Sequence, residues 1–312
     1  MAKNFRGKHL LTLLDLKRDD VRYLLDLAHT LKAERLAGQI QQRFHGRTLA
    51  MLFEKRSTRT RCAFETAFGE EGGCPVFLSG ADIQLGAKES IEDTARVLGR
   101  MFDGIMFRGF SQETVEKLAE YSGVPVYNGL TDLYHPTQVL ADLMTIEENL
   151  GDVAGLDFVY AGDGRNNMAN SLMVGAAMMG MNCTVLAPED LHPQGKLVET
   201  VKGLAEISGA DIRISDDPDA VEGAHVIYTD VWASMGEEEQ MKERIALLEP
   251  YRVDAEMLER TGNPDVLFMH CLPAVKGNEV TFDVIEGPNS VVWDEAENRK
   301  HTIKALMVAS ML

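Results

Sequence analysis

The chain has 312 residues, which is enough for two domains of roughly 100–200 residues. Its 49 acidic and 31 basic residues give a formal net charge of −18, which argues against a general nucleic-acid binder and against a protein that binds anionic membranes by charge. The four cysteines form no C-x-x-C pair, and neither a signal-like N-terminus nor an apolar run of about 18 residues occurs, so we expect a soluble, cytoplasmic protein without a disulfide framework or zinc ribbon.

The spacing of apolar residues predicts strands that alternate with helices along the whole chain. In the first half, helices are expected at 15–38, 59–69, 90–98, 111–121 and 136–149, and strands at 48–53, 75–78, 104–108 and 124–127. After a break at 151–155, helices are expected at 167–179, 193–208, 218–222 and 295–311, and strands at 158–160, 183–187, 211–215, 225–229, 266–269 and 291–293. This alternation is typical of parallel sheets, so the predicted fold class is α/β with two parallel-sheet domains in tandem.

The segment 57–61, with the sequence Ser-Thr-Arg-Thr-Arg, is predicted to join the strand 48–53 to the next helix. The backbone N–H groups and the dipole at a helix N-terminus favour an anion, and a guanidinium can hold two phosphate oxygens at once. The segment therefore predicts a phosphate site. Two alternatives remain open at this point: a plain helix cap followed by solvated arginines, and, with Lys55 and Arg56, a nucleic-acid-binding patch.

Polar residues also follow the predicted carboxyl ends of later strands, which is where open parallel sheets bind ligands. These residues are Arg108, the run 135–138 (His-Pro-Thr-Gln), the run 162–167 (Gly-Asp-Gly-Arg-Asn-Asn), Asp230 and the run 270–273 (His-Cys-Leu-Pro). The run 162–167 lacks the third glycine of a dinucleotide fingerprint, so NAD binding is not predicted. His270 and Cys271 are expected to point to opposite faces of a strand, which argues against a nucleophilic pair and makes a buried structural thiol the default.

Taken together, these segments resemble the aspartate/ornithine carbamoyltransferase family over essentially the whole chain. The segments that carry the resemblance are Ser57-Thr58-Arg59-Thr60-Arg61, His135-Pro136-Thr137-Gln138, Asp230 with Ser234-Met235-Gly236, and His270-Cys271-Leu272-Pro273. The first two are shared across carbamoyltransferases, whereas the Ser-Met-Gly and His-Cys-Leu-Pro segments are of the ornithine type. We find no departure from the family pattern at these positions.

The resemblance implies a carbamoyl-phosphate domain at 1–148, an ornithine domain at 149–294, and a final helix at 295–312 that returns to the first domain. In relatives the loop around Gln84 reaches a neighbouring subunit's site, which implies a homotrimer, or a multiple of trimers, with shared active sites. The implied partners are carbamoyl phosphate and L-ornithine, with no cofactor, metal, nucleic acid or membrane.

The implied reaction transfers the carbamoyl group to the δ-amine of ornithine and gives citrulline and phosphate. Residues implied to bind carbamoyl phosphate are Ser57, Thr58, Arg59, Thr60, Gln84, Arg108, His135, Gln138, Cys271, Leu272 and Arg299. Residues implied to bind ornithine are Asn167, Asp230, Ser234 and Met235. Catalytic roles are implied for Arg108 and His135 as donors to the carbonyl oxygen, and for Asp230 and Cys271 as partners in the proton step.

Two other functions compete with this one. In the first, the acceptor amine is putrescine or an acylated ornithine. Putrescine has no α-carboxylate, so Asp230 and the Ser-Met-Gly segment would lose part of their purpose, and their presence favours ornithine. The second makes 55–61 a nucleic-acid patch, which predicts further basic clusters and interleaved aromatic residues that the chain lacks. The general base, the role of Arg61 and the physiological direction of the reaction stay open.

Overall fold

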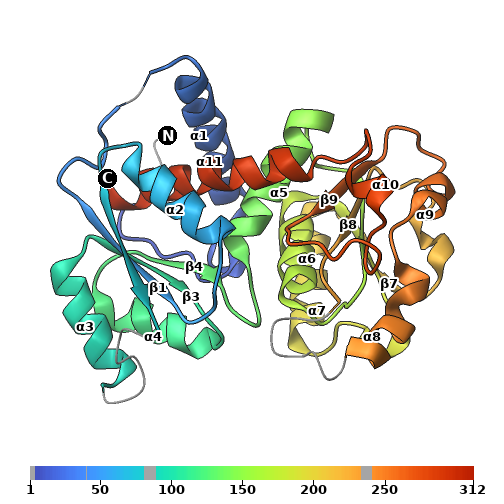
Figure 1. Ribbon diagram of the computed structural model, residues 1–312, viewed down its shortest axis with the longest axis horizontal. Coiled ribbons are helices and arrows are strands. Elements are labelled where there is room, and N and C mark those ends of the chain that lie inside the picture. The colour runs from blue at the N-terminus through green and yellow to red at the C-terminus, as the bar shows by residue number, and fades with distance from the viewer. Residues whose placement is uncertain (1–3, 40, 81–88, 233–240) are drawn as a thin grey trace. The chain divides into compact units, whose positions relative to one another are not determined.

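The computed structural model describes residues 4–39, 41–80, 89–232 and 241–312 (Figure 1). The chain divides into two compact units, Met1–Met144 with Glu297–Leu312, and Thr145–Ala296. In the part of the chain that is described, no helix combines the length and apolar character needed to cross a bilayer.

The first unit is built on a four-stranded parallel sheet with the order β2-β1-β3-β4. Its strands are β1 (Thr48–Phe53), β2 (Cys74–Ser79), β3 (Gly104–Arg108) and β4 (Val126–Leu130). After the short 3-10 turn η1 (Leu13–Asp15), its helices are α1 (Arg18–Leu36), α2 (Arg59–Gly69), α3 (Ile91–Met101) and α4 (Gln112–Ser122). Helix α5 (Pro136–Leu150) begins in this unit and continues beyond its boundary at Met144. Apolar residues of β1 and β3, including Leu52 and Phe107, pack with Leu98 of α3 and Leu118 of α4 in one buried cluster. Because Phe53 pairs with Arg108 in the register, β1 and β3 end side by side, at the edge where polar residues follow.

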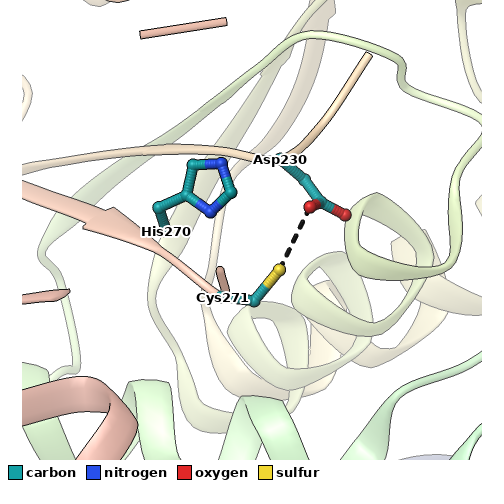
Figure 2. A group of neighbouring side chains, drawn as sticks. All are labelled: Asp230, His270 and Cys271. Carbon is teal, nitrogen blue, oxygen red and sulfur yellow. Dashed lines mark hydrogen bonds between the residues drawn. The ribbon is translucent and has the colours of Figure 1, made fainter. Parts of the chain in front are cut away.

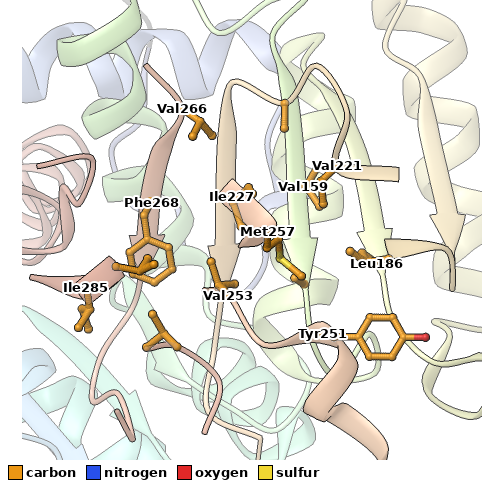
Figure 3. Close-up of a cluster of buried hydrophobic side chains, with 14 of the residues drawn as sticks. Val159, Leu186, Val221, Ile227, Tyr251, Val253, Met257, Val266, Phe268 and Ile285 are labelled. Carbon is orange, nitrogen blue, oxygen red and sulfur yellow. The ribbon is translucent and has the colours of Figure 1, made fainter. Parts of the chain in front are cut away.

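The second unit is built on a five-stranded parallel sheet with the order β7-β6-β5-β8-β9. Its strands are β5 (Asp157–Ala161), β6 (Asn182–Leu186), β7 (Ile212–Ser215), β8 (Val226–Thr229) and β9 (Leu267–His270), and its helices are α6 (Asn167–Met179), α7 (Lys196–Ser208), α8 (Met241–Leu248), α9 (Ala255–Arg260) and α10 (Phe282–Ile285), with 3-10 turns η2 (Glu189–Leu191), η3 (Pro218–Val221) and η5 (Glu249–Tyr251). Val159, Ile227 and Phe268 from three neighbouring strands form a core with Met257 of α9 and Ile285 of α10 (Figure 3).

The last helix, α11 (Val292–Met311), places its residues from Glu297 onward in the first unit. Lys32 Nζ of α1 donates to Asn298 Oδ1 at 2.8 Å, and Lys304 Nζ donates to Glu70 Oε2 at 2.9 Å beside the end of α2. Near the C-terminus, Tyr127 and Ser310 are joined by a buried hydroxyl–hydroxyl bond of 2.7 Å. The predicted fold class and the predicted return of the final helix to the N-terminal helices are confirmed.

The structure corrects some expected elements. The strand expected at 291–293 is wrong, because Val292 already begins α11 and only Ser290 forms an isolated bridge, with Phe268. The first turn of α11 carries Asp294 and Glu295, which suit the positive end of a helix dipole. The helix expected at 218–222 is a 3-10 turn, and α8, α9 and α10 were not predicted.

Candidate active site

The segment 57–61 joins β1 to α2 and places a helix N-terminus at the sheet edge, as its sequence predicts. Thr58 is the N-cap residue but makes no side-chain cap, and Ser57 Oγ instead accepts the N–H of Thr60 at 3.2 Å. A cavity of about 720 Å³ opens beside this turn. Its lining includes Lys55, Arg56, Ser57, Thr58 and Arg61. Helix dipole, backbone N–H groups and basic side chains therefore converge on one concave surface, which favours an anion.

Thr60 is the meeting point of two guanidinium groups from distant parts of the chain. Arg108, at the end of β3, donates from Nη1 to Thr60 Oγ1 at 3.1 Å. Arg299, on α11, donates from Nη2 to the same oxygen at 3.2 Å. Thr60 and Arg299 are almost completely buried, at 1 % and 2 % exposure, so the charge of Arg299 lies in a region of low dielectric, whereas Arg108 is partly exposed.

His135 lies between β4 and α5 and is 3 % exposed. Burial lowers the pKa of its imidazole well below the usual value of 6.5, and the charges of Arg299, Arg108 and Arg59 lower it further. The ring is therefore neutral at physiological pH. It can donate one N–H without adding a further positive charge to the cluster.

Gln138, in the first turn of α5, connects this cluster to a buried carboxylate. Its Oε1 accepts Arg299 Nη1 at 2.7 Å, and its Nε2 donates to Asp142 Oδ1 at 2.8 Å. Gln138 and Asp142 are both 1 % exposed. The first unit thus gathers Thr60, Arg108, His135, Gln138 and Arg299 as expected, with Arg59 at the start of α2 and near enough to act on His135.

Arg61 is engaged within its own unit. Its Nε lies 3.0 Å from Glu65 Oε1, one helical turn away, and its guanidinium carbon is 3.9 Å from the centroid of the Phe77 ring. Both contacts favour a role in which Arg61 supports the turn at 57–61 rather than touches a ligand.

In the second unit, Asp230 follows β8 and Cys271 follows β9 (Figure 2). The Cys271 thiol donates to Asp230 Oδ1 at 3.1 Å, and the same oxygen accepts the N–H of Val231 at 2.8 Å. Burial raises the pKa of Asp230, although His270 and these hydrogen bonds act in the opposite direction. Asp230 is thus a carboxylate with a stronger affinity for a proton than usual.

His270 is fully buried, and its tautomer follows from its contacts. Its Nδ1 accepts the N–H of Leu272 at 2.8 Å, so Nε2 carries the proton and points to Glu279 Oε1 at 3.3 Å. The backbone N–H of His270 also donates to Glu295 Oε2 at 3.0 Å. These bonds fix the end of β9 and the backbone that holds Cys271.

The expectation that His270 and Cys271 point to opposite faces is wrong, because β9 ends at His270 and strand alternation does not extend to Cys271. Potential ligand atoms of Asp230, His270 and Cys271 lie within 4.8 Å of one another, close enough to hold a cation. A metal there would have to displace the proton of the Cys271 thiol, which now donates to Asp230 Oδ1.

Asn167 is the first residue of α6, beyond the end of β5. The neighbouring Asn166 caps this helix through Oδ1 and donates from Nδ2 to Tyr160 at 2.6 Å. The second unit thus brings Asp230, Cys271 and Leu272 together and places Asn167 at the end of a nearby strand. Three expected site residues, Gln84, Ser234 and Met235, lie outside the described residues.

The sequence reasoning missed three buried carboxylates that contact site residues: Asp142, Glu279 and Glu295. Asp142 had a detectable signal, because it lies four residues after Gln138 and hence on the same helical face. Glu279 and Glu295 had none, because Glu279 lies in a turn and Glu295 at the start of α11, and no sequence period relates either of them to His270.

Comparisons with known proteins agree with this geometry. Residues 8–148 match the family described as aspartate/ornithine carbamoyltransferase, carbamoyl-P binding domain, and residues 154–310 match its Asp/Orn binding domain. The chain is 63 % identical to the ornithine carbamoyltransferase of Caldanaerobacter subterraneus subsp. tengcongensis and 64 % identical to that of Pseudothermotoga lettingae, in each case over 100 % of both chains. Among solved structures, the ornithine carbamoyltransferase from Pyrococcus furiosus is 45 % identical with a TM-score of 0.96, over 99 % of this chain and 98 % of the other.

Proposed function

Because the chain belongs to the aspartate/ornithine carbamoyltransferase family, we propose that its two groups of site residues divide the substrates of one reaction between them. The reaction is that of ornithine carbamoyltransferase: the carbamoyl group of carbamoyl phosphate passes to the δ-amine of L-ornithine, which yields L-citrulline and phosphate. The observation that carries the assignment of residues is the buried cluster around Thr60, where two guanidiniums donate to one hydroxyl oxygen and act on the neutral imidazole of His135.

In the first unit, Ser57, Thr58, Arg59 and Thr60 hold the phosphate at the N-terminus of α2. Arg108 and His135 donate to the carbamoyl oxygen, Arg299 adds a further donor, and Gln138 Oε1 accepts the carbamoyl N–H. As the amine attacks, negative charge develops on the carbonyl oxygen. Each donor to such an oxygen is typically worth about 3–4 kcal/mol in the transition state.

In the second unit, Asn167, Asp230, Ser234 and Met235 bind the α-amino and α-carboxylate groups of ornithine, while Cys271 and Leu272 lie beside the reacting amine. An unperturbed alkyl amine has a pKa of about 10.4, so it must lose a proton before it attacks. The raised pKa of Asp230 makes this carboxylate, with the Cys271 thiol bonded to it, suited to that proton step. The new C–N bond forms as the C–O bond to phosphate breaks, and phosphate leaves with the electron pair.

The carbamoyl-phosphate domain is assigned to residues 1–148 with the returning helix 295–312, and the ornithine domain to 149–294. We also propose a homotrimer, or a multiple of trimers, in which Gln84 completes a neighbouring subunit's site. A cytoplasmic location is supported by the four cysteines, all of them among the described residues, none of which forms a disulfide. Light scattering of the purified protein tests the assembly: a monomer at working concentration would contradict it.

The direct test is citrulline formation from carbamoyl phosphate with ornithine, and product formation with putrescine, N-acetylornithine and aspartate in parallel. Ornithine is expected to be the preferred acceptor. Turnover with another amine but none with ornithine would overturn the assignment.

The division of substrates is tested by Arg59→Ala and Cys271→Ala. Arg59→Ala is expected to abolish most activity, because the phosphate loses a guanidinium, whereas Cys271→Ala chiefly raises the KM for ornithine. Equal, small losses of kcat/KM in both variants would contradict this division.

A further inference from the structure

Asp142 is a buried carboxylate that the proposed mechanism does not use. It lies one turn after Gln138 on α5, it is 1 % exposed, and its Oδ1 accepts Gln138 Nε2 at 2.8 Å. Burying a carboxylate away from water costs free energy unless hydrogen bonds compensate for its lost hydration. Its position behind a substrate-binding amide indicates a role in orienting that amide.

The orientation of the Gln138 amide is fixed from both sides. A guanidinium has only donors, so the Gln138 atom that lies 2.7 Å from Arg299 Nη1 must be the oxygen. Asp142 Oδ1 is the acceptor in the second contact, so the Gln138 atom that faces it must be the nitrogen. If the amide turned over, an N–H group would face the guanidinium and an oxygen would face the carboxylate. Both contacts would then be repulsive.

The locked orientation decides what the amide offers to a ligand. An amide oxygen has two lone pairs, so Gln138 Oε1 can accept a hydrogen bond from a ligand beside the one from Arg299. A carbamoyl group supplies such a donor with its NH2, whereas the methyl group of acetyl phosphate has nearly the same shape and no N–H. A site built to accept a hydrogen bond discriminates strongly against the analogue that lacks the donor.

We propose that Asp142 is a specificity-determining positioning residue, which holds Gln138 Oε1 toward the acyl group so that the site selects carbamoyl phosphate over acetyl phosphate. The inference rests on the proposed contact between Gln138 and the carbamoyl NH2. It adds that the selectivity of this contact depends on a residue that does not touch the substrate.

The test variant is Asp142→Asn, which keeps the size of the side chain but presents either an oxygen or a nitrogen to Gln138. Three constants are measured: the KM for carbamoyl phosphate, the inhibition constant of acetyl phosphate as its competitor, and the inhibition constant of inorganic phosphate. The ratio of the acetyl phosphate constant to the carbamoyl phosphate KM is expected to fall about tenfold, the change that about 1.4 kcal/mol represents. Inhibition by phosphate, which has no acyl group, is expected to change less than threefold.

A carboxylate–amide exchange supplies the rescue experiment. In the double variant Gln138→Glu with Asp142→Asn, the amide of residue 142 donates to the carboxylate of residue 138, which again presents an oxygen to Arg299 and to the ligand. The ratio is expected to return to within about threefold of the wild type, a difference of about 0.7 kcal/mol. Glu148→Gln, an exposed position on the same helix, serves as the matched control and is expected to leave all three constants unchanged.

The outcomes separate this inference from the proposed function. If the wild type forms no citrulline or does not prefer carbamoyl phosphate, the proposed function fails first. If the wild type does both but Asp142→Asn keeps the wild-type ratio of the acetyl phosphate constant to the carbamoyl phosphate KM, the positioning role of Asp142 is refuted. It is also refuted if all three constants change alike. Circular dichroism confirms folding. If Asp142→Asn does not fold, the double variant provides the test. A ratio of the acetyl phosphate constant to the carbamoyl phosphate KM near that of the wild type supports the positioning role of Asp142, and a ratio about tenfold lower overturns it.

Discussion

Replacing Glu70 with glutamine tests whether the ion pairs between α2 and α11 hold the first unit together. Glu70 accepts Lys304 Nζ at 2.9 Å, Lys300 Nζ at 3.3 Å and Arg35 Nε at 2.9 Å. Burial raises the pKa of Glu70, but the two lysines lower it by more, so the net shift is downward and the carboxylate is charged in the folded state. Glu70→Gln keeps the shape of the side chain and removes that charge.

The magnitude follows from what is left around Lys304. Its side chain is 3 % exposed, and its remaining carboxylate is that of Glu71, 3.7 Å away. Removing one partner of a buried ion pair typically costs about 3–5 kcal/mol. Since Glu70 is 23 % exposed and Glu71 stays in place, we expect about 2 kcal/mol. For a unit of this size, that free energy corresponds to a fall in Tm of about 4–8 °C.

The assay is thermal unfolding of the intact protein together with the KM for carbamoyl phosphate. The KM is expected to rise as well, because α11 carries Arg299, which donates to Thr60 and Gln138. The control is Glu113→Gln, which removes an exposed ion pair with Lys117 and should change the free energy of unfolding by less than about 0.5 kcal/mol. Equal shifts in Tm for the two variants would refute the reasoning.

Two further predictions concern stability. His301 is 1 % exposed, and burial lowers its pKa from 6.5 to about 4, so its contribution to the free energy of unfolding is complete above pH 6.5 and is lost as the pH falls toward 4, by about 1.4 kcal/mol per pH unit. Urea unfolding at pH 7, 5.5 and 4.5 should show that the free energy of unfolding depends less on pH in His301→Gln than in the wild type. Parallel pH dependences of the two proteins would contradict this. A Cβ on Gly99 of α3 would lie 1.8 Å from the backbone oxygen of Ser122, so Gly99→Ala should destabilise the protein by about 3 kcal/mol. A Cβ on Gly203 of α7 would have no atom of the described residues within 4 Å, apart from its chain neighbours and the backbone of its own helix, so Gly203→Ala should stabilise the protein by about 0.5–1 kcal/mol. Thermal unfolding of both variants measures this contrast, and shifts of the same sign would refute it.

The sequence predicted most of the strands of the two sheets, because these strands are buried, apolar and bounded by turns. Where it failed, the signal was ambiguous or absent. The run 291–293 is short and apolar, and such a run fits a strand or a buried helix end equally well. The short helices α8 to α10 have too few turns to show a period.

The site was predictable where one local motif carried the chemistry and not where distant residues meet. The turn at 57–61 was recognisable as a candidate anion site from the predicted strand before it and from its own hydroxyl groups and arginines. By contrast, the contact of Lys304 with Glu70 joins residues 234 positions apart, and no periodicity along the chain relates them. The partners of His270 were equally hidden, since no periodicity along the chain relates Glu279, in a turn, or Glu295, at the start of α11, to His270.

The return of α11 to the first unit has a consequence for how the protein is made. The bond between Thr60 and Arg299 spans 239 residues, so the turn at 57–61 leaves the ribosome long before the arginine that donates to it. At about 5–20 residues per second, roughly 12 to 48 seconds separate the synthesis of the two. During that interval the nascent first unit lacks α11, and the apolar surface that this helix covers has to be shielded by other means. The whole second unit is synthesised before the first can close.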